Sequence, residues 1–165
     1  MNPEQWTNFF MLVGSGSAAL AGLVFVAITI NLRGVAEDAT HRYRAINMLT
    51  GFSSAFMIST LALMGQQAPE ALAIEWLIVA LPATAINTNG YFRAFRLRGS
   101  SRYALSPFRV VGGSVCYLGQ IVGSLMLLLG DGMGINIAAI ALVANFYFLI
   151  SGSWLLIVGT RPRTD

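Results

Sequence analysis

The sequence predicts an all-α protein, an integral membrane bundle of five transmembrane helices. Its 165 residues are 56% hydrophobic and only 10% charged, which is too apolar for a water-soluble domain. Five stretches without charged residues are each long enough, with their flanks, to cross a hydrocarbon core about 30 Å thick. The 10 basic residues are all Arg, and a five-span path places every one of them on the same side of the membrane.

The first three spans are bounded by charged residues. The first is predicted at about 8–32, because residues 6–32 carry no charge and are followed by Arg33. The second, at about 45–65, begins after Arg44. The third, at about 72–92, contains Pro82, which removes one backbone hydrogen bond and is expected to kink the helix.

The last two spans follow in the same way. The fourth is predicted at about 110–130, between Arg109 and Asp131. The fifth is predicted at about 134–159, between Asp131 and Arg161. The connections between spans are short, so neighbouring helices are expected to be antiparallel and residues 1–165 to form a single transmembrane domain.

The arginines predict the orientation. Basic residues are enriched in cytoplasmic connections, so the N-terminus is expected outside and the C-terminus in the cytoplasm. The connection between the third and fourth spans mixes Arg with aromatic and aliphatic residues, a composition that suits anionic lipid headgroups. The residues expected to contact headgroups are Arg93, Arg96, Arg98, Arg102 and Arg109. No contiguous basic face indicates nucleic-acid binding.

The sequence offers little for catalysis. Proton relays, ion-coupled transporters and voltage sensors need ionisable residues at membrane depth, and the predicted spans contain none there. His41 is the only histidine and is placed in a solvated connection, while Cys116 has no second thiol to pair with. We therefore predict no enzyme activity, no metal site and no cofactor.

Small residues recur at a spacing of four, which lets two helix backbones approach closely in a membrane. They are Gly14, Ala18 and Gly22 in the first span, and Gly119 and Gly123 in the fourth. Packing within one chain is favoured over contact with a second chain.

Uncharged polar residues are concentrated in the half of the spans that is predicted to face the cytoplasm. The intramembrane set is Asn31, Asn47, Thr50, Ser54, Thr84, Asn87, Thr88, Gln120 and Asn145. Unpaired amides are costly in hydrocarbon, so these residues are expected to face one another or water. Two interpretations remain open: hydrogen bonds between helices, or a polar vestibule open to the cytoplasm.

The opening WTNFF at 6–10, followed by GSGSAALAGLVFVAITINL at 14–32, resembles the first span of small bacterial multi-span membrane proteins of unknown function. Some of these carry the label modulator of FtsH protease. The closing SGSWLLIVG at 151–159 resembles the end of the same group. The resemblance implies a bacterial inner-membrane setting and no catalytic or ligand-binding residues.

The predicted function is that of a non-enzymatic accessory or scaffold subunit in a homo-oligomeric or hetero-oligomeric membrane assembly. Its predicted partners are anionic membrane lipids and other membrane protein chains. One alternative is a small channel or facilitator that uses the polar half of the spans as its vestibule. A second alternative, regulation of a membrane protease, follows from the resemblance alone.

Overall fold

All regular secondary structure is helical over the residues described by the computed structural model, which are 3–37, 39–65, 67–96 and 107–159. In this part of the chain the helices are α1 (Pro3–Ile30), α2 (Leu32–Glu37), α3 (Ala39–Leu63), α4 (Pro69–Arg96), α5 (Pro107–Leu128) and α6 (Met133–Gly159). All except α2 are long and apolar enough to cross a membrane. The predicted all-α class and the five candidate spans are therefore confirmed.

The largest departure from the prediction lies between the first two spans. The chain forms the short helix α2 there, and α3 begins at Ala39 instead of near residue 45. The prediction ended each span at a charged residue, but long Arg side chains can extend along a helix to reach the membrane surface. His41, expected in a solvated connection, lies on α3 and is buried.

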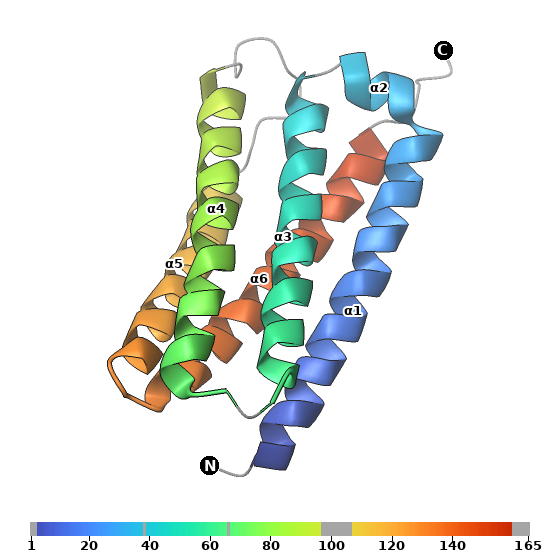
Figure 1. Cartoon of the computed structure of the whole chain (residues 1–165). Helices are drawn as coiled ribbons and strands as arrows, with labels where there is room; N and C mark the ends of the chain where they lie inside the picture. Colours follow the sequence, from blue (N-terminus) through green and yellow to red (C-terminus); the bar gives the residue numbers. More distant parts are fainter. Residues whose placement is uncertain (1–2, 38, 66, 97–106, 160–165) are drawn as a thin grey trace.

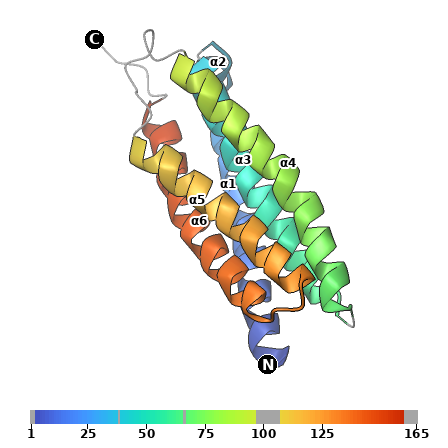
Figure 2. The same cartoon turned by 90° about the vertical axis from the view of Figure 1, so that its left-hand side faces the viewer.

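Four of the helices form a closed ring. Helices α3, α4, α5 and α6 contact one another in chain order, and α6 returns to contact α3 (Figures 1 and 2). Helix α1 lies outside this ring, packed mainly along α3 and touching α2 and α6. Near its N-terminus α1 also reaches α4, where the ring centroids of Phe10 and Trp76 lie 5.6 Å apart.

Each ring helix buries one stripe of residues that recurs about every 3.5 positions, the repeat that keeps one face against its neighbours. On α4 this stripe is Ala73, Trp76, Ala80, Ala83, Asn87 and Gly90, and on α5 it is Gly113, Tyr117, Gln120, Ser124 and Leu127. The stripes are apolar near one end of the bundle and polar toward the other.

The apolar end of the ring is filled by a hydrophobic cluster that we call the apolar plug. It contains Ala55, Ile58, Ala73, Trp76, Val79, Leu127, Ala138 and Leu142 of the ring, together with Phe10 and Val13 of α1. The indole N–H of Trp76 donates a hydrogen bond to the carbonyl of Ile58 at 3.1 Å. The plug therefore buries its one large polar group with a partner.

The turn between α5 and α6 fixes these two helices as an antiparallel pair. Gly130 adopts a φ of 84°, and the amide of Asp131 donates to the carbonyl of Met126 at 2.9 Å, which closes α5 in a Schellman motif. The carboxylate of Asp131 then accepts from the amide of Met133 at 2.9 Å and caps the start of α6. One short turn thus ends one helix and begins the next.

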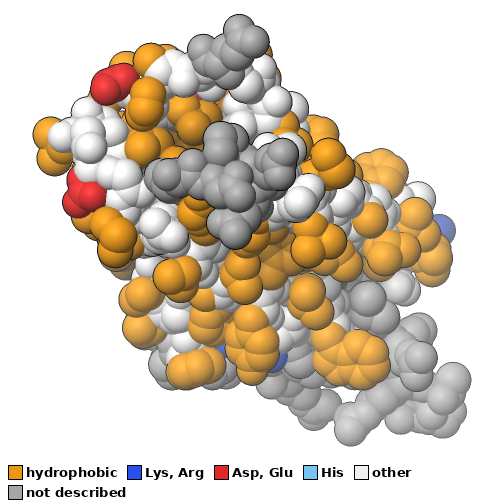
Figure 3. All heavy atoms as spheres, turned by 90° about the horizontal axis from the view of Figure 1, so that it is seen from below, with side chains coloured by type: hydrophobic (Ala, Val, Ile, Leu, Met, Phe, Trp, Pro, Cys, Tyr) orange, Lys and Arg blue, Asp and Glu red, His pale blue; other side chains and the backbone are white. Residues whose placement is uncertain are grey.

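Charged residues lie at the two ends of the bundle, with Glu37 at the same end as the arginines. Arg33, Arg42, Arg44, Arg93 and Arg109 lie at the end where α3 and α5 begin, which we call the arginine end. Glu70, Glu75 and Asp131 lie at the opposite end, the acidic end, which Figure 3 views directly. Exposed Leu, Ile, Val and Phe side chains cover the surface between the ends, as expected of a lipid-facing belt.

Candidate functional site

The interior of the ring holds a set of buried polar side chains that we call the polar core. They come from all four ring helices: Asn47 and Ser54 on α3, Asn87 on α4, Tyr117, Gln120 and Ser124 on α5, and Asn145 on α6. Each is exposed to 5% or less of its surface. The polar core lies between the apolar plug and the arginine end, and it is the strongest candidate for a functional site.

Glycines bring these polar side chains against the backbones of neighbouring helices. A β-carbon added at Gly90 would lie 2.5 Å from Oδ1 of Asn47, and one added at Gly51 would lie 3.0 Å from the Tyr117 hydroxyl. One added at Gly113 would lie 2.8 Å from the hydroxyl of Tyr91. The absence of a side chain at these positions gives the amides and phenols their room.

The Tyr117 side chain crosses the ring interior from α5. Its hydroxyl lies beside Ser54 of α3 and Asn145 of α6. Three of the four ring helices therefore meet around one phenol, and this phenol is fully buried.

The serine hydroxyls of the polar core are satisfied within their own helices, but its amides and the Tyr117 hydroxyl are not. Ser54 donates to the carbonyl of Gly51 at 2.9 Å, and Ser124 donates to that of Gln120 at 2.8 Å. Within the described part of the chain, the following buried atoms have no hydrogen-bond partner: Asn47 Oδ1, Asn87 Nδ2, Tyr117 Oη, Gln120 Oε1 and Nε2, and Asn145 Nδ2. An unsatisfied buried polar group costs about 1–3 kcal/mol, so the polar core is expensive to maintain.

The chemistry open to the polar core is hydrogen bonding to uncharged groups. Its members are amides, hydroxyls and one phenol, and none is a carboxylate, imidazole, amine or guanidinium. The described residues also contain no group of three or more His, Cys, Asp and Glu side chains that could hold a metal ion. Neutral donors and acceptors of this kind suit water or an uncharged polar molecule.

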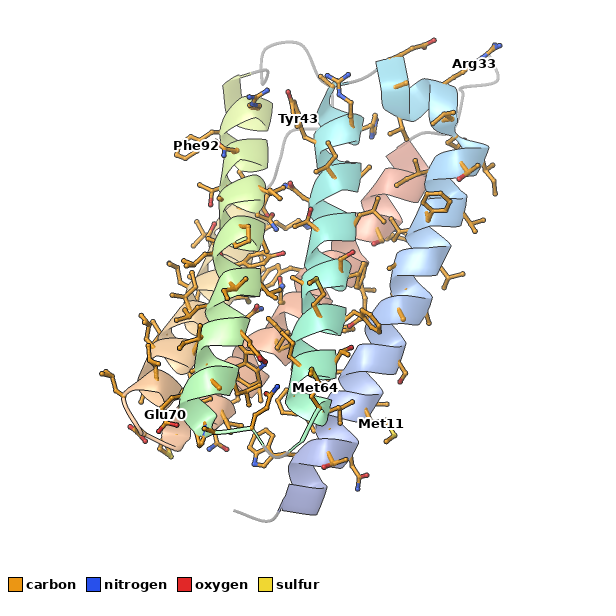
Figure 4. The ribbon with its side chains drawn as sticks, in the orientation of Figure 1. Met11, Arg33, Tyr43, Met64, Glu70 and Phe92 are labelled. Carbon is orange, nitrogen blue, oxygen red and sulfur yellow. The ribbon has the colours of Figure 1, made fainter. Side chains whose placement is uncertain are left out.

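The apolar plug closes the ring on the acidic side of the polar core. Trp76 is 1% exposed and Leu142 is 2% exposed, so the plug is tightly filled where it meets the polar residues. The side chains packed between α3 and α4 are visible along the bundle in Figure 4. A polar solute in the core would meet hydrocarbon before it reached the acidic end.

Most of the polar residues named from the sequence meet in the ring. Asn47, Ser54, Asn87, Gln120 and Asn145 all belong to the polar core, and Thr50 and Thr84 are half-buried on the same helices. Gly51, Gly90 and Gly113, the glycines that face polar side chains, were not predicted from the sequence. A seven-residue repeat would have helped, because residues seven apart lie on the same face of a helix. Gly51 and Ile58 are seven apart and both belong to the inner stripe of α3.

Two predicted members of the polar set lie elsewhere. Thr88 is exposed, and its hydroxyl donates to the carbonyl of Thr84 on its own helix at 2.7 Å. Asn31 lies at the junction of α1 and α2, where its carbonyl accepts from the amide of Val35 at 3.0 Å. A threonine can satisfy its hydroxyl within its own helix, so it has no need to face the interior.

The small residues divide between the inside and the outside of the bundle. A β-carbon at Gly123 would lie 2.6 Å from the backbone nitrogen of Ala138, and one at Gly119 would lie 2.9 Å from Cβ of Ala141, so both glycines pack α5 closely on α6. Gly14 packs on Ser59 of α3, with 3.2 Å between the Cβ positions.

Ala18 and Gly22 do not pack within the chain as predicted. Ala18 is exposed, and a β-carbon at Gly22 would have no neighbour within 4 Å. The buried residues of α1 recur about every 3.5 positions, whereas Gly14, Ala18 and Gly22 are spaced by four. The row of small residues therefore turns away from α3 after Gly14.

The predicted headgroup residues are only partly described. Arg93 is exposed near the end of α4, where its Nη1 donates to the Tyr43 hydroxyl at 3.4 Å, and Arg109 is half-buried in the first turn of α5. Arg98 and Arg102 lie outside the described residues, as does the side chain of Arg96.

Comparisons with protein-family models, with curated proteins and with solved structures find no match for this chain. The resemblance of residues 6–32 to small bacterial membrane proteins therefore stays a prediction.

Proposed function

We propose that this chain is a non-enzymatic subunit of a bacterial inner-membrane assembly that works by packing against other membrane chains. The observation that carries the proposal is the position of α1. This helix stands outside the ring, is the least buried of the long helices, and turns Ala18 and Gly22 away from the bundle. An unused row of small residues on a membrane helix suits close contact with a helix of another chain.

The hydroxyl of Ser15, on the outward face of α1, needs no hydrogen-bond partner from another chain. Ser15 lies on this face, and its hydroxyl already donates to the carbonyl of Met11 at 2.7 Å. A second helix could therefore lie along Ser15, Ala18 and Gly22 without burying an unsatisfied group. In a lipid environment, where hydrophobic attraction between helices is weak, this close van der Waals contact drives association.

The test is the native mass of the protein and its co-purifying chains in a gentle detergent. The double variant Ala18→Leu and Gly22→Leu is expected to reduce the assembly to single chains, because the added bulk separates the backbones. The matched control is Ala85→Leu on the exposed face of α4. Equal masses for the double variant and the native protein would contradict packing through α1.

A small facilitator is the second candidate, and the unpartnered atoms of the polar core favour it. Amides without partners could line a vestibule for water or a small uncharged solute at the arginine end. We rank it second because the apolar plug lies across the path to the acidic end. We expect no solute flux from the purified protein in liposomes; reproducible flux that Asn87→Leu abolishes in a folded protein would reverse the ranking.

The proposed orientation places the arginine end, and with it the C-terminus, in the cytoplasm, and the N-terminus outside. The segregation of described arginines from Glu70 and Asp131 supports it through the positive-inside rule. In a Cys116→Ala background, Ala36→Cys should react with an impermeant thiol reagent only from the cytoplasmic side, and Gly132→Cys only from the other side. Labelling of both positions from one side would contradict this topology.

Regulation of a membrane protease is a narrower form of the same packing role. It rests on the resemblance of residues 6–32 alone. Co-purification of a membrane-bound protease with the native chain, but not with the Ala18→Leu and Gly22→Leu double variant, would support it.

A further inference from the structure

Two arginines from neighbouring helices converge on one tyrosine ring at the arginine end of the bundle. The guanidinium carbon of Arg42 lies 5.8 Å from the centroid of the Tyr43 ring, and that of Arg93 lies 5.9 Å from it. Nη1 of Arg93 also donates to the Tyr43 hydroxyl at 3.4 Å. Tyr43 stands between the ends of α3 and α4 in Figure 4.

Within the described ranges, the two positive charges have no carboxylate bound to them. Their shared partner is the same aromatic residue, Tyr43, which carries no charge of its own in its protonated form. Arg42 and Tyr43 also lie near the first turn of α3, where the helix dipole adds partial positive charge. Like charges held close together repel, and an anion bound between them removes this cost.

The chemistry of the three side chains suits a phosphate group. A guanidinium presents a planar pair of donors that matches phosphate oxygens, and two guanidiniums can bind one phosphate from two sides. The Tyr43 hydroxyl accepts from Arg93, so its own proton is available to a third phosphate oxygen. Three donor groups from two helices are therefore gathered around one tyrosine ring.

The position of the cluster indicates where this phosphate comes from. Arg42 lies near the start of one membrane-crossing helix and Arg93 near the end of the next, at the depth where lipid headgroups meet water. Phe92 and Ile46, beside these residues in sequence, are exposed apolar side chains that would contact acyl chains.

We propose that Arg42, Tyr43 and Arg93 form a binding site for the phosphate of an anionic lipid headgroup. This site is separate from the α1 surface and from the polar core. It does not depend on the proposed packing function.

The test compares lipid retention by two double variants with the same change in charge. The site variant is Arg42→Gln with Arg93→Gln, and the control is Arg33→Gln with Arg161→Gln, two arginines outside the set expected to contact headgroups. Detergent-solubilised protein is titrated with phosphatidylglycerol or phosphatidylcholine, and bound lipid is counted by native mass spectrometry. We expect the site variant to lose at least about tenfold in affinity for phosphatidylglycerol and the control to lose less than about threefold.

Three results would overturn the proposal. Equal losses in the two double variants would mean general attraction to a basic surface. Equal retention of phosphatidylcholine and phosphatidylglycerol by the native protein would remove the requirement for an anionic lipid. Inorganic phosphate that binds the native protein as tightly as phosphatidylglycerol would identify free phosphate, and not a lipid, as the ligand.

Thermal unfolding in lipid-free detergent checks that the variants fold. If the site variant does not fold, Arg93→Gln replaces it and Arg33→Gln becomes its control. The same ranking of affinities is expected for these single variants, and its failure there would equally overturn the proposal.

Discussion

The two halves of the four-helix ring solve the problem of a membrane interior in different ways. In the half near the acidic end, Trp76 packs among Ile58, Leu127 and Leu142, and its indole N–H has a carbonyl partner. In the half near the arginine end, Asn87, Gln120 and Asn145 are equally buried, but side-chain atoms of each lack a partner among the described residues. The same helices thus have one half in which the large buried polar group is hydrogen-bonded and another in which buried amides without partners lower stability.

The two halves also differ in their effect on stability. Filled apolar packing stabilises the ring, and close backbone contacts between α5 and α6 add to it. Unpartnered amides lower stability, and an apolar residue of similar size would remove the cost. Substitutions in the two halves should therefore change the free energy of unfolding in opposite directions.

The largest effect is expected from Trp76→Ala in the apolar plug. Removing a buried Trp from a filled core costs about 3–5 kcal/mol, because the neighbours cannot close the cavity. The free energy of unfolding in lipid bicelles measures it. Trp154→Ala is the control, because Trp154 is 67% exposed and its removal leaves no cavity. Similar losses for the two variants would mean that the plug is not what stabilises the ring.

A slightly smaller loss, about 3 kcal/mol, is expected from Gly123→Leu. The new side chain would meet the backbone nitrogen of Ala138 and the carbonyl oxygen of Gly134, each 2.6 Å from the added β-carbon. Backbone atoms cannot rotate away, so α5 and α6 must separate. Gly22→Leu, at a glycine with open space around it, should leave the unfolding of the isolated chain unchanged within about 0.5 kcal/mol.

The smallest effect, and the opposite sign, is expected from Gln120→Met in the polar core. Methionine has a similar volume and no unsatisfied amide, so the free energy of unfolding should rise by about 1 kcal/mol. Ser124→Ala is the control, because its hydroxyl is already bonded within α5 and the change should stay within about 0.5 kcal/mol. A loss of stability in Gln120→Met would show that the amide has a partner in the membrane.

The sequence predicted the spans well because charged residues mark the ends of membrane helices. The first predicted span, 8–32, overlaps α1 at Pro3–Ile30 almost fully, and the fourth, 110–130, overlaps α5 at Pro107–Leu128. The prediction was least accurate around Arg33 to Arg44, where α2 and the early start of α3 went unseen. Charge marks the membrane surface there, but the backbone stays helical past it.

The candidate site could be predicted only in part. Polarity alone identified Asn47, Asn87, Gln120 and Asn145, because an amide in a membrane helix has few places to lie. It could not separate these from Thr88, whose hydroxyl is satisfied within its own helix. The Arg93 contact with Tyr43 joins residues 50 positions apart, and it depends on how α3 and α4 align, which residue spacing within one helix does not contain.

The chain-order contacts of the ring have a consequence for how the protein is made. Helix α3 meets α1, α4 meets α3, and α5 meets α4, so each helix that enters the bilayer during synthesis finds its neighbour already inserted. The α5–α6 turn then brings the last helix to its partner across a loop of a few residues, which costs little chain entropy. Among the described residues, the main backbone contact between long helices that do not follow one another in the chain is that of α6 with α3. Closing the ring, and with it burying the amides, is therefore the last step, taken when the ribosome has delivered the final helix.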